Sequence, residues 1–453
     1  MKIPKILENI SESFTHHDIK AILVGGSVRD AILGIEPKDF DIEVYGIDSL
    51  DELEAILSEF GKTNSVGKSF GVVKLTVDKK EYDFSLPRVE KKTGAGHRGF
   101  DVVCDGGLDF QTAFRRRDFT INSIGYDIQE KNFIDVYGGI EDLKKRVLRV
   151  VDEKTFVEDP LRVYRAVQFV ARFELEVEPK SFELLKKMVD SGSLDELPKE
   201  RVYGEFKKLL LKAKKPSLGF VMMKELGILD YFAELKAIVW IEQEPLYHPE
   251  GDVWTHTIKA LDECKKDIKL LLATLCHDMG KAVTTEVIDG KITSRGHEEA
   301  GVKIAESFLK RLTDDKRLIE GVLPLVRWHF APSAFFKQRA KNKAIRRLST
   351  KVNIEELVEV AKADFLGRDT DEAKKRVFKA GEWLLKKAKK LRVENSPPKP
   401  FVQGKNLIEL GLKPSPLFKQ ILGELYEKQL DGDFKDVDEA LKYLKSNFSN
   451  ISS

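Results

Sequence analysis

The sequence has little cysteine and no long hydrophobic run. Its three cysteines, Cys104, Cys264 and Cys276, lack the spacing of a disulfide framework or a metal site, which fits a reduced cytoplasm. No run of about 18 apolar residues is present, so nothing predicts a membrane span. Residues 1–14 are amphipathic and partly acidic, unlike a signal peptide. We therefore expect a cytoplasmic protein with no membrane partner.

The sequence also lacks a strong net charge. Lys, Arg, Asp and Glu make up 34% of the residues, but the net charge is only +2. Overall charge therefore does not indicate a nucleic-acid binder, and any RNA-binding surface must come from local segregation of charge. The chain of 453 residues suggests about three domains, and its 42% hydrophobic content is enough to build buried cores.

A glycine turn follows the first predicted strand. The apolar run at residues 21–24 predicts a short buried strand, which stops at Gly25 and Gly26. Ser27 is a good N-cap, so residues 28–33 are expected to form a short helix. Backbone N–H groups and the helix dipole at such a turn can take the charge of a phosphate.

Two carboxylates follow on the next predicted strand, residues 40–45. Asp39 and Asp41 stand at its start, and both are expected on one face because strand side chains repeat with a period of two. Carboxylates hold hard divalent metal ions. A glycine turn and two carboxylates in one short unit therefore suit a magnesium-bound triphosphate.

This order of motifs resembles the polymerase-β-like nucleotidyltransferases. More narrowly, GGSVRD at residues 25–30 and KDFDIEVYG at residues 38–46 resemble the class II bacterial tRNA nucleotidyltransferase (CCA-adding enzyme) and poly(A) polymerase family. The resemblance implies that Asp39 and Asp41 are catalytic and hold Mg²⁺. It also implies nucleotide contacts from four residues of the first motif, Gly25, Gly26, Ser27 and Arg29.

FRRRDFTINSIGY, residues 114–126, resembles the RRDFTIN motif of the same family. Asp118 and Asn122 are four residues apart, which predicts a shared helix face. Arg116 and Arg117 carry guanidinium groups that suit triphosphate oxygens. The resemblance implies that these four residues hold the triphosphate and the ribose hydroxyls.

The choice of base is expected to come from EDPLRVYR, residues 158–165. Arg162 can donate hydrogen bonds and Asp159 can accept them, and cytosine and adenine each offer an amino group beside an acceptor. Guanine and uracil place a carbonyl oxygen where that amino group would be, and Asp159 would repel it. The segment resembles the base-reading motif of the family, which implies this role for Asp159 and Arg162. Glu158 and Arg165 are second choices.

Two further segments of the N-terminal part carry weaker signals. Residues 72–77 and 82–86 predict strands, and Asp83 on the second is at most an auxiliary carboxylate. Residues 86–101 are basic and rich in glycine, so we expect an irregular loop there. It is either an ordinary solvated loop or, as the resemblance implies, a flexible loop that helps the site change from adding C to adding A.

Five of the eight histidines fall between residues 248 and 329. Neutral imidazoles and carboxylates together make a mixed site for a divalent transition metal. The order of His256, the His277-Asp278 pair and Asp364 resembles the HD superfamily of metal phosphohydrolases. That resemblance implies that these four residues are metal ligands.

The histidine segments also resemble the multifunctional, HD-containing branch of the tRNA nucleotidyltransferases. That branch has phosphatase, 2'-nucleotidase and 2',3'-cyclic phosphodiesterase activity, so the resemblance implies a second active site. His297 and His329 are further candidates, for a second metal or for phosphate. An HD remnant that no longer binds metal is the alternative.

The pattern along the chain predicts an α+β protein, with a polymerase-β-like nucleotidyltransferase head followed by all-α parts. The head, a mixed sheet with helices, is expected over residues 1–145. A helical neck and body for base recognition and RNA binding, which includes the basic helical segment 197–217, is expected over residues 146–235. The HD domain is expected over residues 236–394 and a helical tail over residues 395–453.

These observations predict an enzyme that adds CCA to tRNA 3' ends without a template. Its substrates would be CTP and ATP, with pyrophosphate released, Mg²⁺ in the head and a divalent transition metal in the HD domain. A monomer or a homodimer is expected. The alternatives are an enzyme that adds only CC or only A, a poly(A) polymerase, or an HD phosphohydrolase whose head only binds RNA. The C-terminal residues have little basic character, which argues against the poly(A) polymerase.

Overall fold

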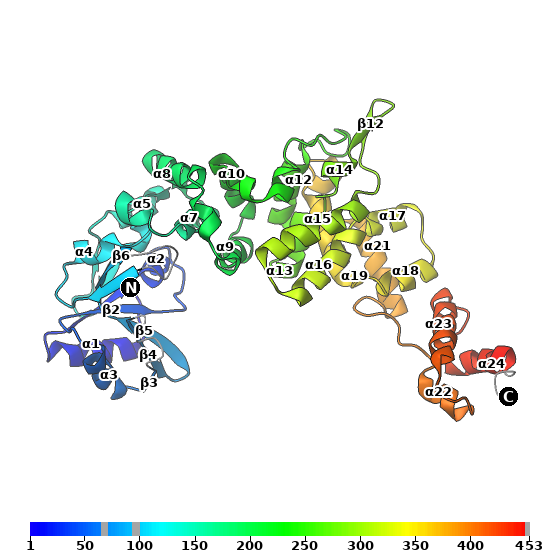
Figure 1. The fold of residues 1–453 in the computed structure, drawn as a ribbon, viewed down its shortest axis with the longest axis horizontal. Helices are drawn as coiled ribbons and strands as arrows, with labels where there is room; N and C mark the ends of the chain where they lie inside the picture. The colour runs from blue at the N-terminus through cyan, green and yellow to red at the C-terminus, as the bar shows by residue number, and fades with distance from the viewer. Residues whose placement is uncertain (65–70, 93–99, 449–453) are drawn as a thin grey trace. The chain divides into compact units, whose positions relative to one another are not determined.

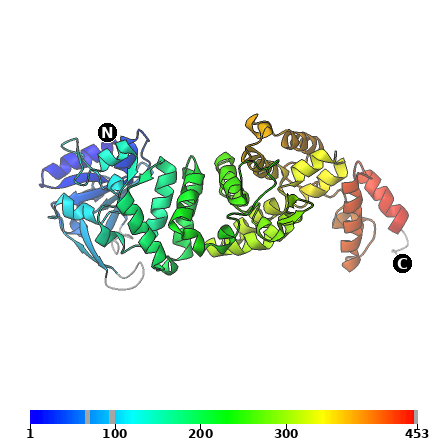
Figure 2. The same cartoon turned by 90° about the horizontal axis from the view of Figure 1, so that it is seen from above.

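The structure, a computed structural model, describes residues 1–64, 71–92 and 100–448. It divides into two compact units, Met1–Tyr231 and Phe232–Ser453, which are described here one at a time (Figures 1 and 2). The first unit combines a sheet with helices, and the second is mostly helical. The predicted α+β class is therefore confirmed. The predicted domain boundaries within each unit stay predictions.

A mixed sheet forms the centre of the first unit. The described strands lie in the order β3-β4-β5-β2-β1-β8-β9. β2 and β5 pair in parallel, and the other neighbours pair antiparallel. The strands are β1 (Lys20–Val24), β2 (Asp41–Tyr45), β3 (Lys62–Asn64), β4 (Val72–Val77), β5 (Lys80–Ser85), β8 (Gly125–Asp127) and β9 (Asn132–Ile134).

Strands β1 and β2 are buried along most of their length because other elements cover the sheet. Four of the five residues in each strand are buried, which is typical of strands packed on both faces. Ile22 and Tyr45 pack against Phe114 of helix α4 (Phe110–Arg115). The other helices of the head are α1 (Lys5–Thr15), α2 (Gly26–Ile32), α3 (Leu50–Ser58) and α5 (Gly139–Lys145).

Helix α2 begins earlier than the sequence predicts. It starts at Gly26, with Gly25 as the N-cap, so the prediction that Ser27 caps the helix is wrong. The hydroxyl of Ser27 instead donates to the carbonyl of Val24 at 3.2 Å, a bond back to the preceding strand. A glycine at the N-cap allows this early start because its φ of +72° is strained for other residues.

The prediction of an irregular loop over residues 86–101 is wrong for its described parts. β6 (Arg88–Lys92) and β7 (Phe100–Cys104) form an antiparallel pair of their own. Residues 93–99, which hold the predicted glycine-rich segment, lie outside the described residues. The role of that segment in changing from C to A addition stays a prediction.

From residue 153 onward the first unit is mainly helical. In α7 (Leu161–Phe173) one apolar stripe is buried, with Val163 and Ala166 at 0% exposure. The described residues of this part add one two-stranded pair, β10 (Val147–Leu148) with β11 (Glu176–Val177). The remaining helices are α6 (Glu153–Phe156), α8 (Pro179–Asp190), α9 (Lys199–Lys212) and α10 (Pro216–Leu226).

Apolar helices form the core of the second unit. α13 (Ile268–Cys276) is buried from Leu270 onward, and it packs against α16 (Lys316–Trp328). α12 (Val253–Glu263) packs in turn against α19 (Ile354–Leu366). The other elements are α11 (Ala233–Lys236), α14 (Lys281–Thr284), β12 (Glu286–Ile288), β13 (Lys291–Thr293), α15 (His297–Leu312), α17 (Ala331–Lys337), α18 (Asn342–Ser349), α20 (Asp371–Lys374) and α21 (Lys379–Leu391).

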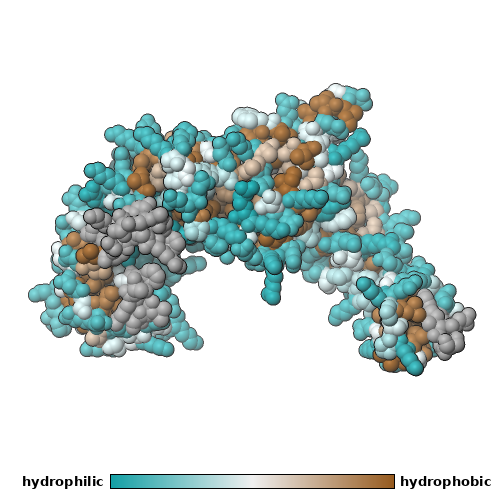
Figure 3. Space-filling view, viewed as in Figure 1, coloured by the Kyte–Doolittle hydropathy of each residue, from teal (hydrophilic) through white to brown (hydrophobic). Residues whose placement is uncertain are grey.

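The surface of the second unit is hydrophilic over much of the face in Figure 3. A hydrophobic group lies over the β12–β13 hairpin, where Val287 is exposed. Among the described residues, no helix has both the length and the apolar character needed to cross a membrane.

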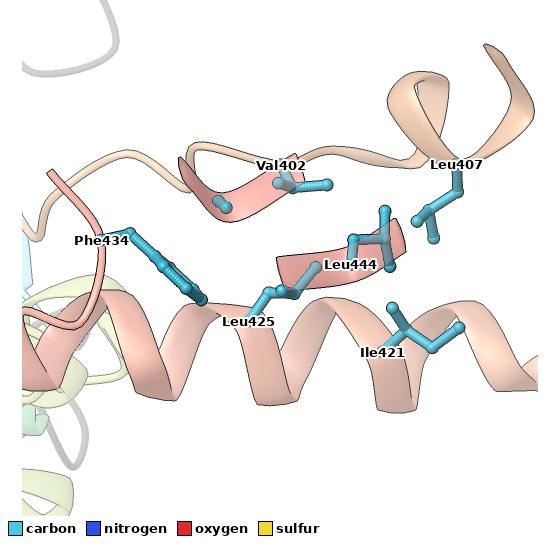
Figure 4. Close-up of a cluster of buried hydrophobic side chains, with 7 residues drawn as sticks. Val402, Leu407, Ile421, Leu425, Phe434 and Leu444 are labelled. Atoms are coloured by element: carbon cyan, nitrogen blue, oxygen red, sulfur yellow. The ribbon is translucent and has the colours of Figure 1, made fainter. Parts of the chain in front are cut away.

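Three helices at the C-terminal end have a small core of their own. α22 (Gly404–Glu409), α23 (Pro416–Asp431) and α24 (Val437–Phe448) follow an extended, proline-rich segment. Figure 4 shows the buried side chains that join them, Val402, Leu407, Ile421, Leu425, Phe434 and Leu444. Arg347 of α18 forms ion pairs with Glu427 and Asp431 of α23, at 2.9 and 2.8 Å.

Candidate active sites

The first site begins where β1 and β2 lie side by side. Val24, the last residue of β1, is paired with Asp41, the first residue of β2. Gly25 follows at once, and a Cβ atom built on it would lie 3.2 Å from Nη1 of Arg117 and 3.9 Å from Oδ2 of Asp41. A side chain at this position would crowd Arg117, so glycine lets the turn, the guanidinium group and the carboxylate come close together.

Negative charge gathers around Asp41. Asp83 of β5 is its neighbour across the parallel strand pair, and Asp39 lies just before β2. The pKa of Asp41 is raised, first by partial burial and then by Asp83 and Asp39, while Arg117 opposes the shift. A hard divalent cation would relieve this repulsion, and the carboxylate oxygens are the ligands it prefers. Asp39 precedes the strand, so the prediction that it shares a strand face with Asp41 stays a prediction.

Glu43 is a functional candidate that the sequence reading missed. It is 1% exposed, and its Oε1 accepts hydrogen bonds from Nη2 of both Arg116 and Arg117, each at 2.7 Å. The hydroxyl of Tyr45 donates to its Oε2 at 3.1 Å. Burial alone would raise the pKa of Glu43, but the two guanidinium groups hold it below its usual value. The alternation of Asp41, Glu43 and Tyr45 along β2 was the available signal.

Asp118 and Asn122 meet, but not on one helix as predicted. α4 ends at Arg115, and residues 120–122 form a separate 3₁₀ turn. That turn brings Nδ2 of Asn122 to 2.8 Å from Oδ1 of Asp118. Arg29 donates to Oδ1 of Asn122 at 2.6 Å, and Arg165 donates to Oδ2 of Asp118 at 2.7 Å. These four side chains form one continuous polar network.

The two residues predicted to choose the base have protein partners in the structure. Arg162 donates to the backbone carbonyls of Thr155 and Arg116, both at 2.7 Å. Oδ2 of Asp159 accepts from Arg201 at 3.0 Å, a partner that the sequence did not reveal. Arg201 lies on α9, more than forty residues away along the chain, so no local pattern connects it to Asp159.

A pocket of about 450 Å³ collects most of these side chains. Asp39, Ser27 and Glu158 are not part of its lining. The lining includes Arg172, Arg201 and Lys208 as additional cations. The predicted residues that do line it are Gly25, Gly26, Arg29, Asp41, Arg116, Arg117, Asp118, Asn122, Asp159, Arg162 and Arg165.

The second site lies where three helices of the second unit meet. His256 is on α12, His277 and Asp278 follow the end of α13, and Asp364 is on α19. Nε2 of His256 is 3.1 Å from Oδ1 of Asp364 and 3.9 Å from Oδ2 of Asp278. Nε2 of His277 is 3.2 Å from the same Asp278 oxygen. The four predicted HD ligands therefore lie together.

Asp278 also faces the two remaining predicted histidines. Its Oδ1 is 3.4 Å from Nε2 of His297, at the start of α15, and 3.8 Å from Nε2 of His329, at the end of α16. The two Nε2 atoms are 3.2 Å apart. The three ligand atoms are thus close enough for one metal ion, and His256, His277 and Asp278 form a second such group.

The histidine rings are oriented for metal binding by bonds on their far sides. Nδ1 of His277, His297 and His329 lies 2.7 to 2.8 Å from the carbonyl oxygen three residues earlier in each case. An Nδ1–H that donates there leaves Nε2 as an acceptor, the form that binds a metal. Nε2 of His277 is buried and has no hydrogen-bond partner among the described residues. The donor set therefore fits a divalent transition metal.

Glu250 orients His256, and the sequence reading missed it. Its Oε1 lies 2.8 Å from Nδ1 of His256 and 2.9 Å from Nδ1 of His248. The available signal was the His248-x-Glu250 spacing, with Glu250 six residues before His256. No local pattern shows that the chain brings Glu250 back to His256.

Cations balance the two buried carboxylates of this site. Lys281 lies 2.7 Å from Oδ2 of Asp278, and Arg368 donates to Asp364 at 2.8 Å. Burial alone would raise the pKa of both carboxyl groups, but His277 and then Lys281 hold the pKa of Asp278 well below its usual value, and Arg368 and then His256 do so for Asp364. A pocket of about 430 Å³ opens here. Of the predicted residues, Asp278, His297, His329 and Asp364 line it, and His256 and His277 do not; its lining also includes Gln243, Tyr247, His248, Lys281, Phe330, Lys337 and Arg368.

Models of known families match successive parts of the chain, and they follow the same order as the two sites. The poly A polymerase head domain matches residues 21–149, and the HD domain matches residues 253–369. The probable RNA and SrmB-binding site of polymerase A matches residues 174–238. The multifunctional CCA protein of Acinetobacter baumannii strain AYE is 37% identical over 302 residues, which are 65% of this chain and 70% of that relative. The chain belongs to the CCA-adding tRNA nucleotidyltransferase family.

Solved structures of CCA-adding enzymes have the same fold. The enzyme of Bacillus stearothermophilus, in complex with CTP, is 20% identical and has a TM-score of 0.67, with 99% of this chain and 100% of that chain covered. The enzyme of Thermotoga maritima, complexed with tRNA, is 22% identical with a TM-score of 0.60, covering 98% and 96%. This family member is thus a nucleotidyltransferase that also carries an HD domain.

Proposed function

We propose that the enzyme adds CCA to the 3' end of tRNA, using CTP and ATP and releasing pyrophosphate. The tRNA 3'-hydroxyl attacks the α-phosphate, and Mg²⁺ held by Asp39 and Asp41 would activate that hydroxyl and steady the leaving group. The observation that carries the proposal is the pocket that Gly25, the carboxylate of Asp41 and the guanidinium of Arg117 line together. Tight binding of the triphosphate there aligns it with the attacking hydroxyl.

Within this proposal, Asp159 and Arg162 read the base. Their present partners fix both side chains at the wall of the same pocket as Gly25 and Asp41. One oxygen of Asp159 accepts from Arg201 and the other from the backbone N–H of Leu161, at 3.2 Å. Each carboxylate oxygen can accept a second bond, so an amino group of cytosine or adenine can still be received. A carbonyl oxygen at that place would be repelled.

The test offers tRNAs that end before C, after CC and after CCA, with each labelled nucleotide in turn. Full CCA addition is expected, with CTP and ATP incorporated and UTP and GTP refused. Addition that stops after CC, adds only A, or continues as poly(A) would identify one of the other products. Incorporation of UTP or GTP as readily as CTP would contradict the role of Asp159 and Arg162. Full addition by the Asp39→Ala, Asp41→Ala double variant would contradict the site itself.

We propose that the HD site hydrolyses phosphoesters, with 2'-nucleotides, 2',3'-cyclic phosphodiesters and phosphate monoesters as substrates. His256, His277, Asp278 and Asp364 would hold a divalent transition metal, with His297 and His329 for a second metal or for phosphate. Such a metal would lower the pKa of a bound water. Lys281 and Arg368 supply positive charge for the phosphate at the same pocket.

The test of the HD proposal compares hydrolysis with and without each added divalent metal. Hydrolysis of a 2',3'-cyclic phosphodiester should require metal and vanish in His277→Ala, while nucleotide addition continues. His17→Ala, at an exposed histidine of the first unit, is the matched control. If the unsubstituted enzyme hydrolyses nothing with any divalent metal, the HD proposal is wrong. An HD remnant that no longer binds metal is then the better explanation. Full CCA addition by the same preparation would exclude a head that only binds RNA.

Three less specific expectations complete the proposal. The basic helix α9, with Lys207, Lys208 and Lys212, is expected to contact tRNA phosphates without reading sequence. The enzyme works as a monomer or a homodimer, which sedimentation would decide. A cytoplasmic location is supported by the three free cysteines and by the tRNA substrate.

A further inference from the structure

Glu43 lies behind the two arginines that are expected to hold the triphosphate. Its carboxylate is 1% exposed, and both Arg116 and Arg117 donate to the same oxygen, Oε1, at 2.7 Å. Tyr45 donates to the other oxygen at 3.1 Å. Glu43 follows Asp41 by two residues on β2, so both side chains lie on one face of the sheet. None of the roles assigned to the head so far uses this carboxylate.

Arg117 lies between two places for negative charge. Its Nη2 contacts Glu43, and its Nη1 lies 3.2 Å from the position of a Cβ atom on Gly25, at the pocket proposed for the phosphates. One guanidinium group can therefore contact an interior carboxylate and a phosphate at the same time. The carboxylate is part of the protein, whereas the phosphate is present only while a nucleotide or pyrophosphate is bound.

A carboxylate in this place has two opposite effects on an anion that enters the pocket. It fixes the guanidinium groups in one orientation, which lowers the cost of ordering them when the anion binds. It also repels the anion through a region where water screens charge weakly. The repulsion acts on the triphosphate and on the pyrophosphate that is left after transfer, which must leave before the next nucleotide can bind.

We propose that Glu43 is a positioning residue that holds Arg116 and Arg117 and limits their affinity for pyrophosphate, so that the product leaves. The inference rests on the proposed nucleotide addition, in which pyrophosphate is the product. A carboxylate with only a structural role would make the opposite prediction, because its removal would disorder the arginines and weaken anion binding.

The experiment measures binding of pyrophosphate to the full-length protein by titration calorimetry, with Mg²⁺ present. Glu43→Gln removes the charge and keeps the size and one acceptor, so we expect pyrophosphate to bind about tenfold more tightly, a change of about 1.4 kcal/mol. Tyr45→Phe keeps the charge and is expected to leave the affinity within about twofold of the unsubstituted protein. Repeated nucleotide addition by Glu43→Gln should be slowed about tenfold, because product release would then limit turnover.

A second pair of variants tests the proposal with balanced charge, because the double variant loses one negative and one positive group together. Arg116→Gln alone should bind pyrophosphate about tenfold more weakly, and the Glu43→Gln, Arg116→Gln double variant should return to within about threefold of the unsubstituted protein. The proposal is overturned if pyrophosphate binds Glu43→Gln no more tightly than before, or if the double variant binds no better than Arg116→Gln. Because binding is measured directly, failure of nucleotide addition in the unsubstituted enzyme would be seen separately.

Discussion

Glu250 holds His256 from behind: Oε1 of Glu250 lies 2.8 Å from Nδ1 of His256, while Nε2 on the other side of the ring faces Asp364 at 3.1 Å. The ring is completely buried, so it cannot turn to another partner. A carboxylate in this position fixes the tautomer and the direction of a metal-binding histidine. Residues that are absent from the HD motif itself therefore complete the site.

Loss of the Glu250 carboxylate should weaken metal binding at the HD site. Glu250→Gln is expected to lower the affinity for the divalent metal by about 10- to 100-fold, measured by metal titration calorimetry. Glu242→Gln, at an exposed glutamate nearby in the sequence, is the control and should leave the affinity unchanged. Equal metal affinity in Glu250→Gln and the unsubstituted protein would show that Glu250 does not orient the ligand.

A side chain at Gly25 should damage nucleotide addition beyond its effect on the backbone. Gly25→Ala imposes strain at a φ of +72° and places a methyl group 3.2 Å from Arg117, so we expect kcat/KM for CTP to fall about 100-fold. Gly34→Ala is the matched control, because Gly34 has a φ of +73° and no atom within 4 Å of the added Cβ. Similar losses in both variants would mean that strain alone, and not the occupied space, is responsible.

The buried ion pair of Asp118 with Arg165 should make the first unit less stable in acid. Its neighbours hold the pKa of Asp118 below the usual value despite burial, so its contribution is complete above the unfolded-state pKa of about 3.9 and is lost as the pH falls through the lower folded-state pKa. Asp118→Asn should lower the free energy of unfolding by roughly 3 kcal/mol at pH 7 and pH 5, and by less below pH 4.

The measurement for Asp118→Asn has a control within the same molecule. All four tryptophans lie in the second unit, so circular dichroism should show the loss while tryptophan fluorescence does not. Asp190→Asn breaks a surface pair with Lys186 at 3.7 Å and should cost less than about 0.5 kcal/mol. A loss for Asp118→Asn that is as large at pH 3 as at pH 7 would contradict the linkage.

Gly280 should tolerate no side chain, because α15 begins directly against it. A Cβ atom there would lie 2.0 Å from the carbonyl oxygen of His297 and 2.6 Å from the backbone nitrogen of Gly301. Gly280→Ala is expected to destabilise the second unit by about 3 kcal/mol and to move His297 away from Asp278. Tryptophan fluorescence during urea unfolding measures the first effect and metal titration the second.

The control for Gly280→Ala is a glycine with open space. Gly423 lies inside α23 with no atom within 4 Å of the added Cβ, so Gly423→Ala should raise stability by up to about 1 kcal/mol. Unchanged metal binding and stability in Gly280→Ala would contradict the close approach of α15.

Sequence reasoning succeeded where a chemical motif was short and local. The glycine turn and the start of β2 are fixed by apolar runs with clear ends, so Gly25 and Asp41 could be placed side by side in advance. The four predicted HD ligands could be grouped only through a family resemblance, because His256 and Asp364 are 108 residues apart and no periodicity connects them.

It failed where tertiary packing decided the local structure. Spacing by four predicted a helix through Asp118 and Asn122, but a 3₁₀ turn after α4 brings the same side chains together. Ser27 has the side chain of an N-cap, yet Gly25 takes that position, because its positive φ lets the helix begin directly after β1. The sequence indicated no role for Glu43, because its contacts with Arg116 and Arg117 form only in the folded chain.

The boundary at Tyr231 and Phe232 has a consequence for how this family can change. In the described parts of the chain, every residue that lines the nucleotide pocket precedes the boundary, and every residue that lines the HD pocket follows it. A gene that loses the histidines of the second pocket keeps all the side chains of the first. Changes in the second pocket can therefore accumulate in one lineage without altering the residues that line the first.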